Sequence, residues 1–180
     1  MKYGIQYNID FKILDKATQK YTETFNCGNP SIDAYFREDA INDSSSVTYL
    51  FIDTDSDELI SCVTLSCSAI FTDTDIENTF STILSAMEIK YFAVDEEYQH
   101  IPYERNAKLS LSYYIFVFML NYMMEMSHNK IGASKVVLYA VPTAVNFYKR
   151  CKFKEFGSTM YGDEGYYVSE CIPMYYDLND

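Results

Sequence analysis

The chain has 180 residues, of which 48% are apolar and 17% aromatic, with 18 Tyr, 12 Phe and no Trp. This length and composition predict one folded domain over residues 1–180 and exclude an intrinsically disordered chain. The 26 acidic and 14 basic residues give a formal net charge of −12. Such a charge repels nucleic acids and anionic membrane surfaces, and it attracts cations such as protonated amines.

The cysteines and the termini bear on the compartment. There are five cysteines and two histidines, and no Cys-x-x-Cys motif occurs, so a disulfide framework and a zinc site are both disfavoured. Residues 1–10 lack the apolar core of a secretory signal. The longest uncharged apolar run, from Leu109 to Met124, is shorter than the ~20 residues that cross a bilayer. We therefore expect a cytoplasmic protein with free thiols, no metal and no membrane partner.

The first part of the chain predicts a strand, a helix and a hairpin. Apolar and polar residues alternate from Ile9 to Leu14, as in a half-buried strand. Asn29 or Ser31 can cap a helix that runs to about residue 42. Residues 47–53 and 59–68 read as two strands, joined by a turn of residues that bond their own backbone. In residues 69–86 the apolar residues do not recur at helical or strand spacing, and no element is predicted there.

A strand, a polar loop and a long helix follow. The strand covers residues 88–94, and the loop covers residues 95–105. The segment from Leu109 to Met126 repeats apolar residues at helical spacing, and they spread over more than one side of the helix. Such a helix is buried on more than one side. Two readings stay open for its second side, namely core packing and a homodimer contact.

The last third of the chain predicts a strand, a short helix and a final strand. Residues 136–140 form a short apolar run that is typical of a buried strand. Pro142 suits the first turn of the helix that follows. Residues 167–177 close the chain as a strand, in which Pro173 marks an edge, a bulge or a break. Taken together, the elements predict an α/β fold, a mixed sheet with helices on both faces.

Two stretches carry a family resemblance. One is the strand end Phe92-Ala-Val-Asp95 followed by Tyr98-Gln99, and the other combines residues 144–149 with Lys152-Phe153. Together they resemble the core of the GCN5-related N-acetyltransferase superfamily. Upstream residues resemble the branch that includes toxin-type acetyltransferases: Phe25-Asn-Cys-Gly28, Ile32-Asp33, Tyr35-Phe36, Ala40, Thr48-Tyr49 and Thr64-Leu-Ser66. The resemblance implies a mostly antiparallel central sheet of six to seven strands, and acetyl-CoA as cosubstrate.

The resemblance also implies where acetyl-CoA binds. The backbone of Phe92, Ala93 and Val94 would pair with the pantetheine arm. The pyrophosphate normally lies in a loop of the form Gln/Arg-x-x-Gly-x-Gly/Ala, whose glycines let backbone amides approach closely. Here Pro102 and Glu104 stand where the glycines are expected. We expect polar side chains to supply phosphate contacts instead, from Gln99, Arg105, Asn106 and Lys108.

Two residues are candidates for the chemistry. Tyr148 matches the tyrosine whose hydroxyl, in the resembling family, protonates the departing thiolate as general acid. The alternative is that Phe147 and Tyr148 are an aromatic pair that packs a short helix. Glu88 is our candidate general base, because it begins the predicted strand beside the expected acceptor cleft. Asp95, Glu96, Glu97 and a bound water are the alternatives.

The resulting functional prediction is an N-acetyltransferase. It would move an acetyl group from acetyl-CoA to a primary amine by direct attack in a ternary complex, with a small molecule or a peptide as acceptor. Two alternatives stay open. One is a non-catalytic binding or dimerisation protein with a decayed coenzyme A site. The other is a toxin-type aminoacyl-tRNA acetyltransferase, which the net charge of −12 disfavours because nucleic-acid binding needs clustered Lys and Arg.

Overall fold

The computed structural model describes residues 7–73, 81–104, 108–158, 160–161 and 170–179. By internal packing the chain divides into two compact units. Unit 1 comprises residues 1–65 and 91–119, and unit 2 comprises residues 66–90 and 120–180. Strands β3 (Glu58–Asp73) and β4 (Ser81–Val94) and helix α2 (Leu111–Met126) each contribute residues to both units.

The strands of unit 1 lie in the order β1-β2-β3-β4. Strand β1 (Ile9–Ile13) is antiparallel to β2 (Ser46–Asp53), with Ile9 opposite Asp53 and Ile13 opposite Tyr49. The short connection between β2 and β3 is the predicted hairpin turn, so this part of the sequence interpretation is confirmed. Two 3-10 turns, Gln19–Tyr21 and Glu96–Tyr98, belong to the same unit.

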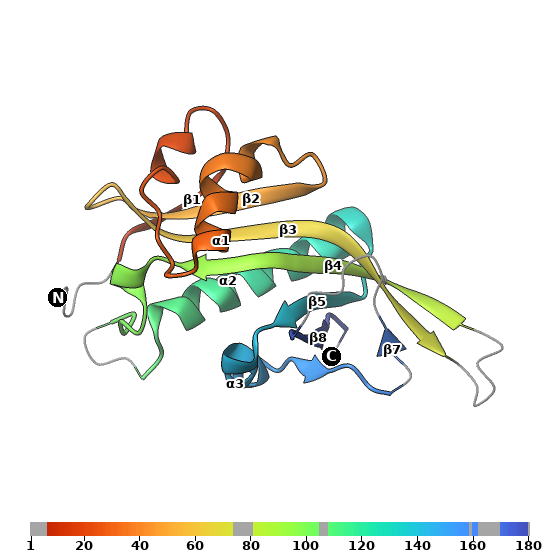
Figure 1. Cartoon of the computed structure of the whole chain (residues 1–180). Coiled ribbons are helices and arrows are strands. Elements are labelled where there is room, and N and C mark those ends of the chain that lie inside the picture. Colours follow the sequence, from red (N-terminus) through yellow and green to blue (C-terminus); the bar gives the residue numbers. More distant parts are fainter. Residues whose placement is uncertain (1–6, 74–80, 105–107, 159, 162–169, 180) are drawn as a thin grey trace. The chain divides into compact units, whose positions relative to one another are not determined.

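One face of the unit 1 strands is covered by the N-terminal helical segment (Figure 1). Helix α1 (Pro30–Ala34) continues into a π-helical turn, Tyr35–Asp39, and a 3-10 turn, Ala40–Asn42. The side chain of Asn29 caps α1 by accepting from the amides of Ser31 and Ile32, as predicted. Beneath the helix lies a core of buried residues: Leu14, Phe25, Phe36, Ala40, Leu50, Ile52, Leu59, Cys62 and Ala93.

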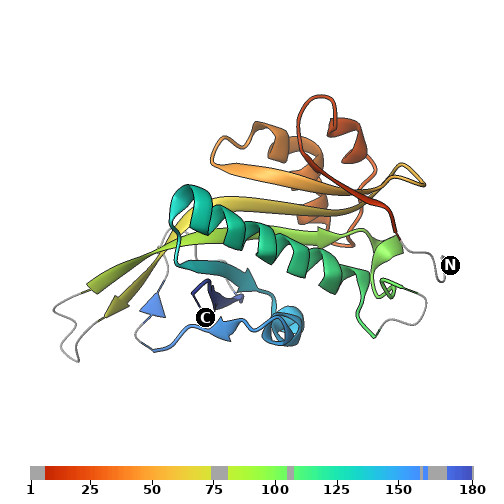
Figure 2. The ribbon, with the colours of Figure 1, turned by 180° about the vertical axis from the view of Figure 1, so that it is seen from behind.

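The opposite face of unit 1 is covered by the first part of α2, which Figure 2 shows in front of the strands. The ring of Phe118 lies 5.3 Å from that of Phe11 on β1 and 5.7 Å from that of Phe51 on β2. Leu50 and Ile52 face α1, whereas Phe51 faces α2. Successive residues of a strand point to opposite faces. This explains why residues 49–52 of β2 are all apolar instead of alternating with polar residues.

Unit 2 contains the remaining elements. The end of α2 runs into a π-helical turn, Ser127–Ile131, and then into β5 (Lys135–Ala140). A 3-10 turn, Pro142–Ala144, leads into α3 (Val145–Arg150), and Pro142 occupies the first turn as predicted. The strand β8 (Ile172–Asp177) and the two-residue strands β6 (Lys154–Glu155) and β7 (Met160–Tyr161) complete the unit.

The strand pairing of unit 2 is mixed. Strand β4 is parallel to β5, with Glu88 opposite Val137, and β5 is antiparallel to β8, with Val137 opposite Tyr175. Strand β6 pairs with β8, and β7 pairs with β3, both antiparallel. The predicted fold class, a mixed and mostly antiparallel sheet with helices, is therefore confirmed. No helix in the described part of the chain combines the length and the apolarity that crossing a bilayer requires.

Three predicted boundaries are wrong by five residues or more, and one of them is the start of the last strand, predicted at residue 167 and observed at Ile172. Strand β3 continues to Asp73, and β4 begins at Ser81, seven positions before the predicted start at Glu88. The sequence pattern does not reveal these strand ends, because the apolar residues there are not consistently the buried ones. Ile70 is fully buried, whereas Ile83 is 64% exposed. Without one consistently buried face, a strand shows no alternation.

Candidate active site

The end of β4 is held by side chains of its own unit. The hydroxyl of Ser61 on β3 donates to the carbonyl of Ala93 at 2.7 Å. The ring of Phe92 packs on Phe116 of α2 at a centroid distance of 5.1 Å. The side-chain amide of Gln99 donates to the carbonyl of Val94 at 2.9 Å. The three residues that were predicted to pair with pantetheine, Phe92 to Val94, are thus immobilised at the point where the strand ends.

The loop after β4 folds back on itself. The amide of Tyr103 donates to the carbonyl of Leu109 at 3.1 Å, and the amide of Leu111 donates to the carbonyl of Ile101 at 2.8 Å. The ring of Tyr103 stacks on Tyr114 at 3.9 Å. The pKa of Tyr103 is raised to about 12. The main cause is a hydrogen bond with the Tyr114 hydroxyl, and burial is the second. Helix α2 therefore starts from an anchored loop.

Of the residues predicted to contact phosphate, the structure describes two. Lys108 is exposed, so its ammonium is available to an anion. Gln99 is half-buried and bonds to backbone carbonyls. Arg105 and Asn106 lie outside the described residues.

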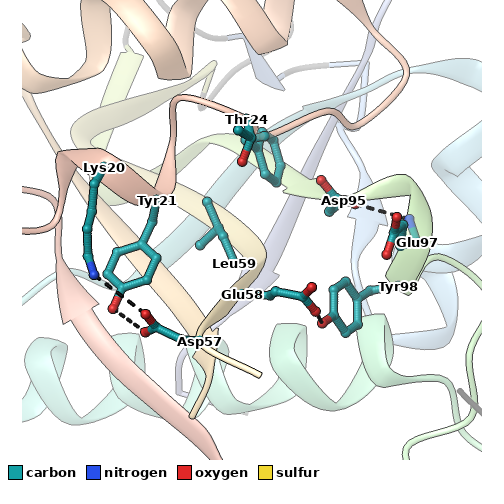
Figure 3. A pocket seen from close by; sticks show the side chains of 10 residues that line it. Lys20, Tyr21, Thr24, Asp57, Glu58, Leu59, Asp95, Glu97 and Tyr98 are labelled. Atoms are coloured by element: carbon teal, nitrogen blue, oxygen red, sulfur yellow. Dashed lines mark hydrogen bonds and ion pairs between the residues drawn. The ribbon is translucent and has the colours of Figure 1, made fainter. Parts of the chain in front are cut away.

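A hollow of about 370 Å³ opens beside the residues that follow β4 (Figure 3). The Tyr98 hydroxyl donates to Glu58 at 2.7 Å, and the Tyr21 hydroxyl donates to Asp57 at 2.6 Å. The bond from Tyr21 is the main reason that the pKa of Asp57 is lowered. Asp95 and Glu97 add two further acidic side chains to the lining. This concentration of negative charge makes the hollow unsuitable for a pyrophosphate.

Tyr148 lies on α3 in unit 2, within an aromatic group. Its ring is 5.3 Å from Phe147 and 6.0 Å from Phe153. Burial is the main cause that raises the pKa of Tyr148, with smaller contributions from the nearby thiols of Cys151 and Cys171. A tyrosine phenol is protonated at neutral pH in any case, and the raised pKa makes this one a weaker acid than an exposed tyrosine.

Glu88 lies in the middle of β4 instead of at its start, which corrects the reason given for choosing it. The residue is 6% exposed, and the Ser66 hydroxyl lies 3.5 Å from its Oε2 atom. Burial raises the pKa of Glu88, and the positive charge of Lys90 and the Ser66 hydroxyl lower it by smaller amounts. A buried carboxylate with a raised pKa is suited to accept a proton near neutral pH.

The candidate residues fall into two groups. Phe92, Ala93, Val94, Gln99 and Lys108 belong to unit 1, where a hydrogen bond joins Gln99 to Val94. Tyr148 and Glu88 belong to unit 2, where β5 pairs with the strand of Glu88 and leads toward α3. Among the described residues, no three His, Cys, Asp or Glu side chains come together as a metal site would require.

Comparison with solved structures identifies the fold. One bacterial toxin superposes with a TM-score of 0.72 at 19% identity, covering 96% of this chain and 92% of its own. A tyrosine-to-phenylalanine mutant of the toxin AtaT gives 0.71 at 11% identity, covering 99% and 94%. A tyrosine-to-phenylalanine mutant of KacT gives 0.69 at 14% identity, covering 95% of each chain.

The chain has the fold of toxin-type GCN5-related acetyltransferases. The sequence resemblance is therefore confirmed at the level of the fold. No protein-family model matches the chain, and no curated protein matches it in sequence.

The raised pKa of Glu88 predicts a pH dependence of stability. Because the folded state holds this proton more tightly than the unfolded state, folded molecules bind more protons between the ordinary pKa of 4.5 and the raised value. The free energy of unfolding then falls as the pH rises through that window. Glu88→Gln removes the charge, so we expect the variant to gain stability over the parent as the pH rises from about 4.5. Urea denaturation at a series of pH values measures this. A constant difference between the two proteins would contradict it.

Proposed function

We propose that this protein is an N-acetyltransferase that moves the acetyl group of acetyl-CoA to a primary amine. The observation that supports this most strongly is the whole-chain likeness to AtaT and KacT, which covers more than nine-tenths of each chain. Two of the similar structures are described as bound to acetyl-CoA. The residues at the end of β4 and the protonated Tyr148 fit the same chemistry.

The reaction needs a held cosubstrate and two proton transfers. The amine nitrogen attacks the thioester carbonyl, the carbon–sulfur bond breaks, and the thiolate of coenzyme A takes a proton. In our proposal the backbone of Phe92 to Val94 pairs with the pantetheine arm and Tyr148 protonates the thiolate. Glu88, directly or through a water, accepts the proton of the amine. Lys108, with Arg105 and Asn106, contacts the phosphates.

The acceptor in this proposal is a small-molecule or peptide amine. The net charge of −12 attracts a protonated amine and repels phosphates. A second candidate is the amine of an aminoacyl-tRNA, because one similar structure is AtaT in complex with acetyl-methionyl-tRNA. The second candidate requires this acidic chain to bind an RNA backbone.

The first prediction concerns acetyl-CoA binding. Replacing Arg105 and Lys108 together with Ala removes two charged phosphate contacts, each of which contributes ~1.5–3 kcal/mol. We expect titration calorimetry to show at least roughly a hundredfold weaker acetyl-CoA binding, with little change for acetyl-pantetheine. Lys130→Ala, another exposed lysine, is the matched control. If the unmutated protein does not bind acetyl-CoA at millimolar concentration, the proposed enzymatic function is wrong. The alternative of a non-catalytic binding or dimerisation protein is then favoured.

The second prediction concerns Tyr148. Tyr148→Phe keeps the ring packing on Phe147 and Phe153 and deletes only the hydroxyl. Loss of a general acid lowers kcat by ~10²-fold or more with little change in acetyl-CoA affinity. Tyr176→Phe deletes a hydroxyl from the same aromatic group, since the Tyr176 ring lies 5.6 Å from Phe153, and it should retain full activity. Turnover of Tyr148→Phe within about twofold of the parent would assign Tyr148 to packing alone.

The third prediction separates the two acceptors. Because few phosphates can be neutralised by 14 scattered basic residues, we expect no complex with bulk tRNA in a filter assay at ~150 mM salt. The same preparation should acetylate free amines in a screen of small molecules and peptides. Tight, salt-sensitive tRNA binding together with acetylation of aminoacyl-tRNA would favour the second candidate.

A further inference from the structure

Gln99 joins two segments that are far apart in the sequence. Its Nε2 atom donates to the carbonyl of Val94 at 2.9 Å and to the carbonyl of Cys27 at 3.0 Å. A glutamine side chain carries two N–H donors. Both are therefore used on backbone carbonyls, and neither is available to a phosphate oxygen. The bonded carbonyls belong to the end of β4 and to residues 26–28, which we call the 26–28 turn.

Further hydrogen bonds fix the same two segments to each other. The amide of Asn26 donates to the Asp95 carboxylate at 3.1 Å, and the Asn26 side chain donates to the Glu96 carboxylate at 3.0 Å. In return, the amide of Glu96 donates to the carbonyl of Asn26 at 2.9 Å. Asn26 and Asp95 lie in the stretches that carry the family resemblance, and Asp95 and Glu96 were alternatives for the general base, but no pairing among the three residues was predicted. Nothing in their local pattern indicates a partner about 70 positions away.

The 26–28 turn also approaches the residues after β4 closely. Gly28 has a backbone φ of +84°, and a side chain there would place its Cβ atom 2.5 Å from the Glu96 carboxylate. The turn continues into α1 through Asp33, which is 4% exposed and accepts from the amide of Cys27 at 2.8 Å. The end of β4, the 26–28 turn and the start of α1 are thus tied into one piece.

We propose that Gln99 is a positioning residue for acetyl transfer, which holds the pantetheine-binding end of β4 and the 26–28 turn in register and does not bind phosphate. This inference rests on the proposed function, because it is the pantetheine arm that gives the position of Val94 its importance. Without the amide donors, two half-buried carbonyls lose a partner. The strand end and the turn are then joined only by the hydrogen bonds among Asn26, Asp95 and Glu96, so the junction loosens. The pantetheine contact then weakens while the phosphate contacts stay intact.

The structural part of the proposal is tested without any ligand. Gln99→Met keeps the length of the side chain and removes both donors. We expect at least roughly tenfold faster hydrogen exchange at the amides of Asn26 and Glu96, which bond across the junction, because local opening costs less free energy. Thr54→Val removes one side-chain hydrogen bond to the backbone elsewhere in unit 1, and it should leave both amides unchanged. Unchanged exchange in Gln99→Met would overturn the proposal.

Ligand binding then separates a positioning residue from a phosphate ligand. For Gln99→Met we expect the affinities for acetyl-CoA and acetyl-pantetheine to fall by the same factor, since both share the pantetheine arm. A loss confined to acetyl-CoA would identify Gln99 as a phosphate ligand and overturn the proposal. Gln99→Lys restores a donor group and should recover part of the lost affinity, which a non-specific folding defect would not allow. If the unmutated protein binds neither compound, the proposed function fails, and the exchange measurement still decides whether Gln99 holds the junction.

Discussion

The structure of unit 1 depends on the burial of β4 on both of its faces. On the face toward α1, Ala93 is buried and Tyr91 packs against Tyr35 at a centroid distance of 4.4 Å. On the face toward α2, Phe92 packs on Phe116. Aromatic contacts of this kind add to the hydrophobic free energy of burial. A strand enclosed in this way has one fixed backbone position, so the loop that leaves it at Val94 starts from a defined point.

Many of the acidic side chains accept hydrogen bonds from groups close to them. Carboxylates around the hollow accept hydrogen bonds from tyrosine hydroxyls, as Glu58 does from Tyr98, and those at the junction accept from Asn26. These contacts satisfy individual oxygens without neutralising the charge. The surrounding surface therefore keeps a negative potential, which favours cationic ligands over anionic ones at a distance. Under the proposed function, an anionic cosubstrate would have to be bound against this potential by individual basic side chains such as Lys108.

The sequence predicted those features that are local or periodic. Helix α2, the β2–β3 hairpin, the Asn29 cap and the position of Pro142 follow from short-range rules, and the structure has all of them. The outer parts of β3 and β4 could not be predicted, because Ile83 is exposed and no buried face imposes an alternation. The hydrogen bond that Gln99 makes to the 26–28 turn could not be predicted either. It arises from a contact with Cys27, 72 positions away, that no local pattern encodes.

The 26–28 turn has a consequence for how this surface can evolve. Gly28 is exposed to solvent, and exposed positions generally accept most substitutions. Here any other residue meets two obstacles at once, a left-handed backbone and the carboxylate of Glu96. The exposed side chain of Glu96 can move away from a Cβ atom, so the left-handed backbone is the lasting obstacle, and Asn, which tolerates that conformation, is the least costly replacement. A surface glycine in this protein would behave, across a set of diverging sequences, like a residue of the interior.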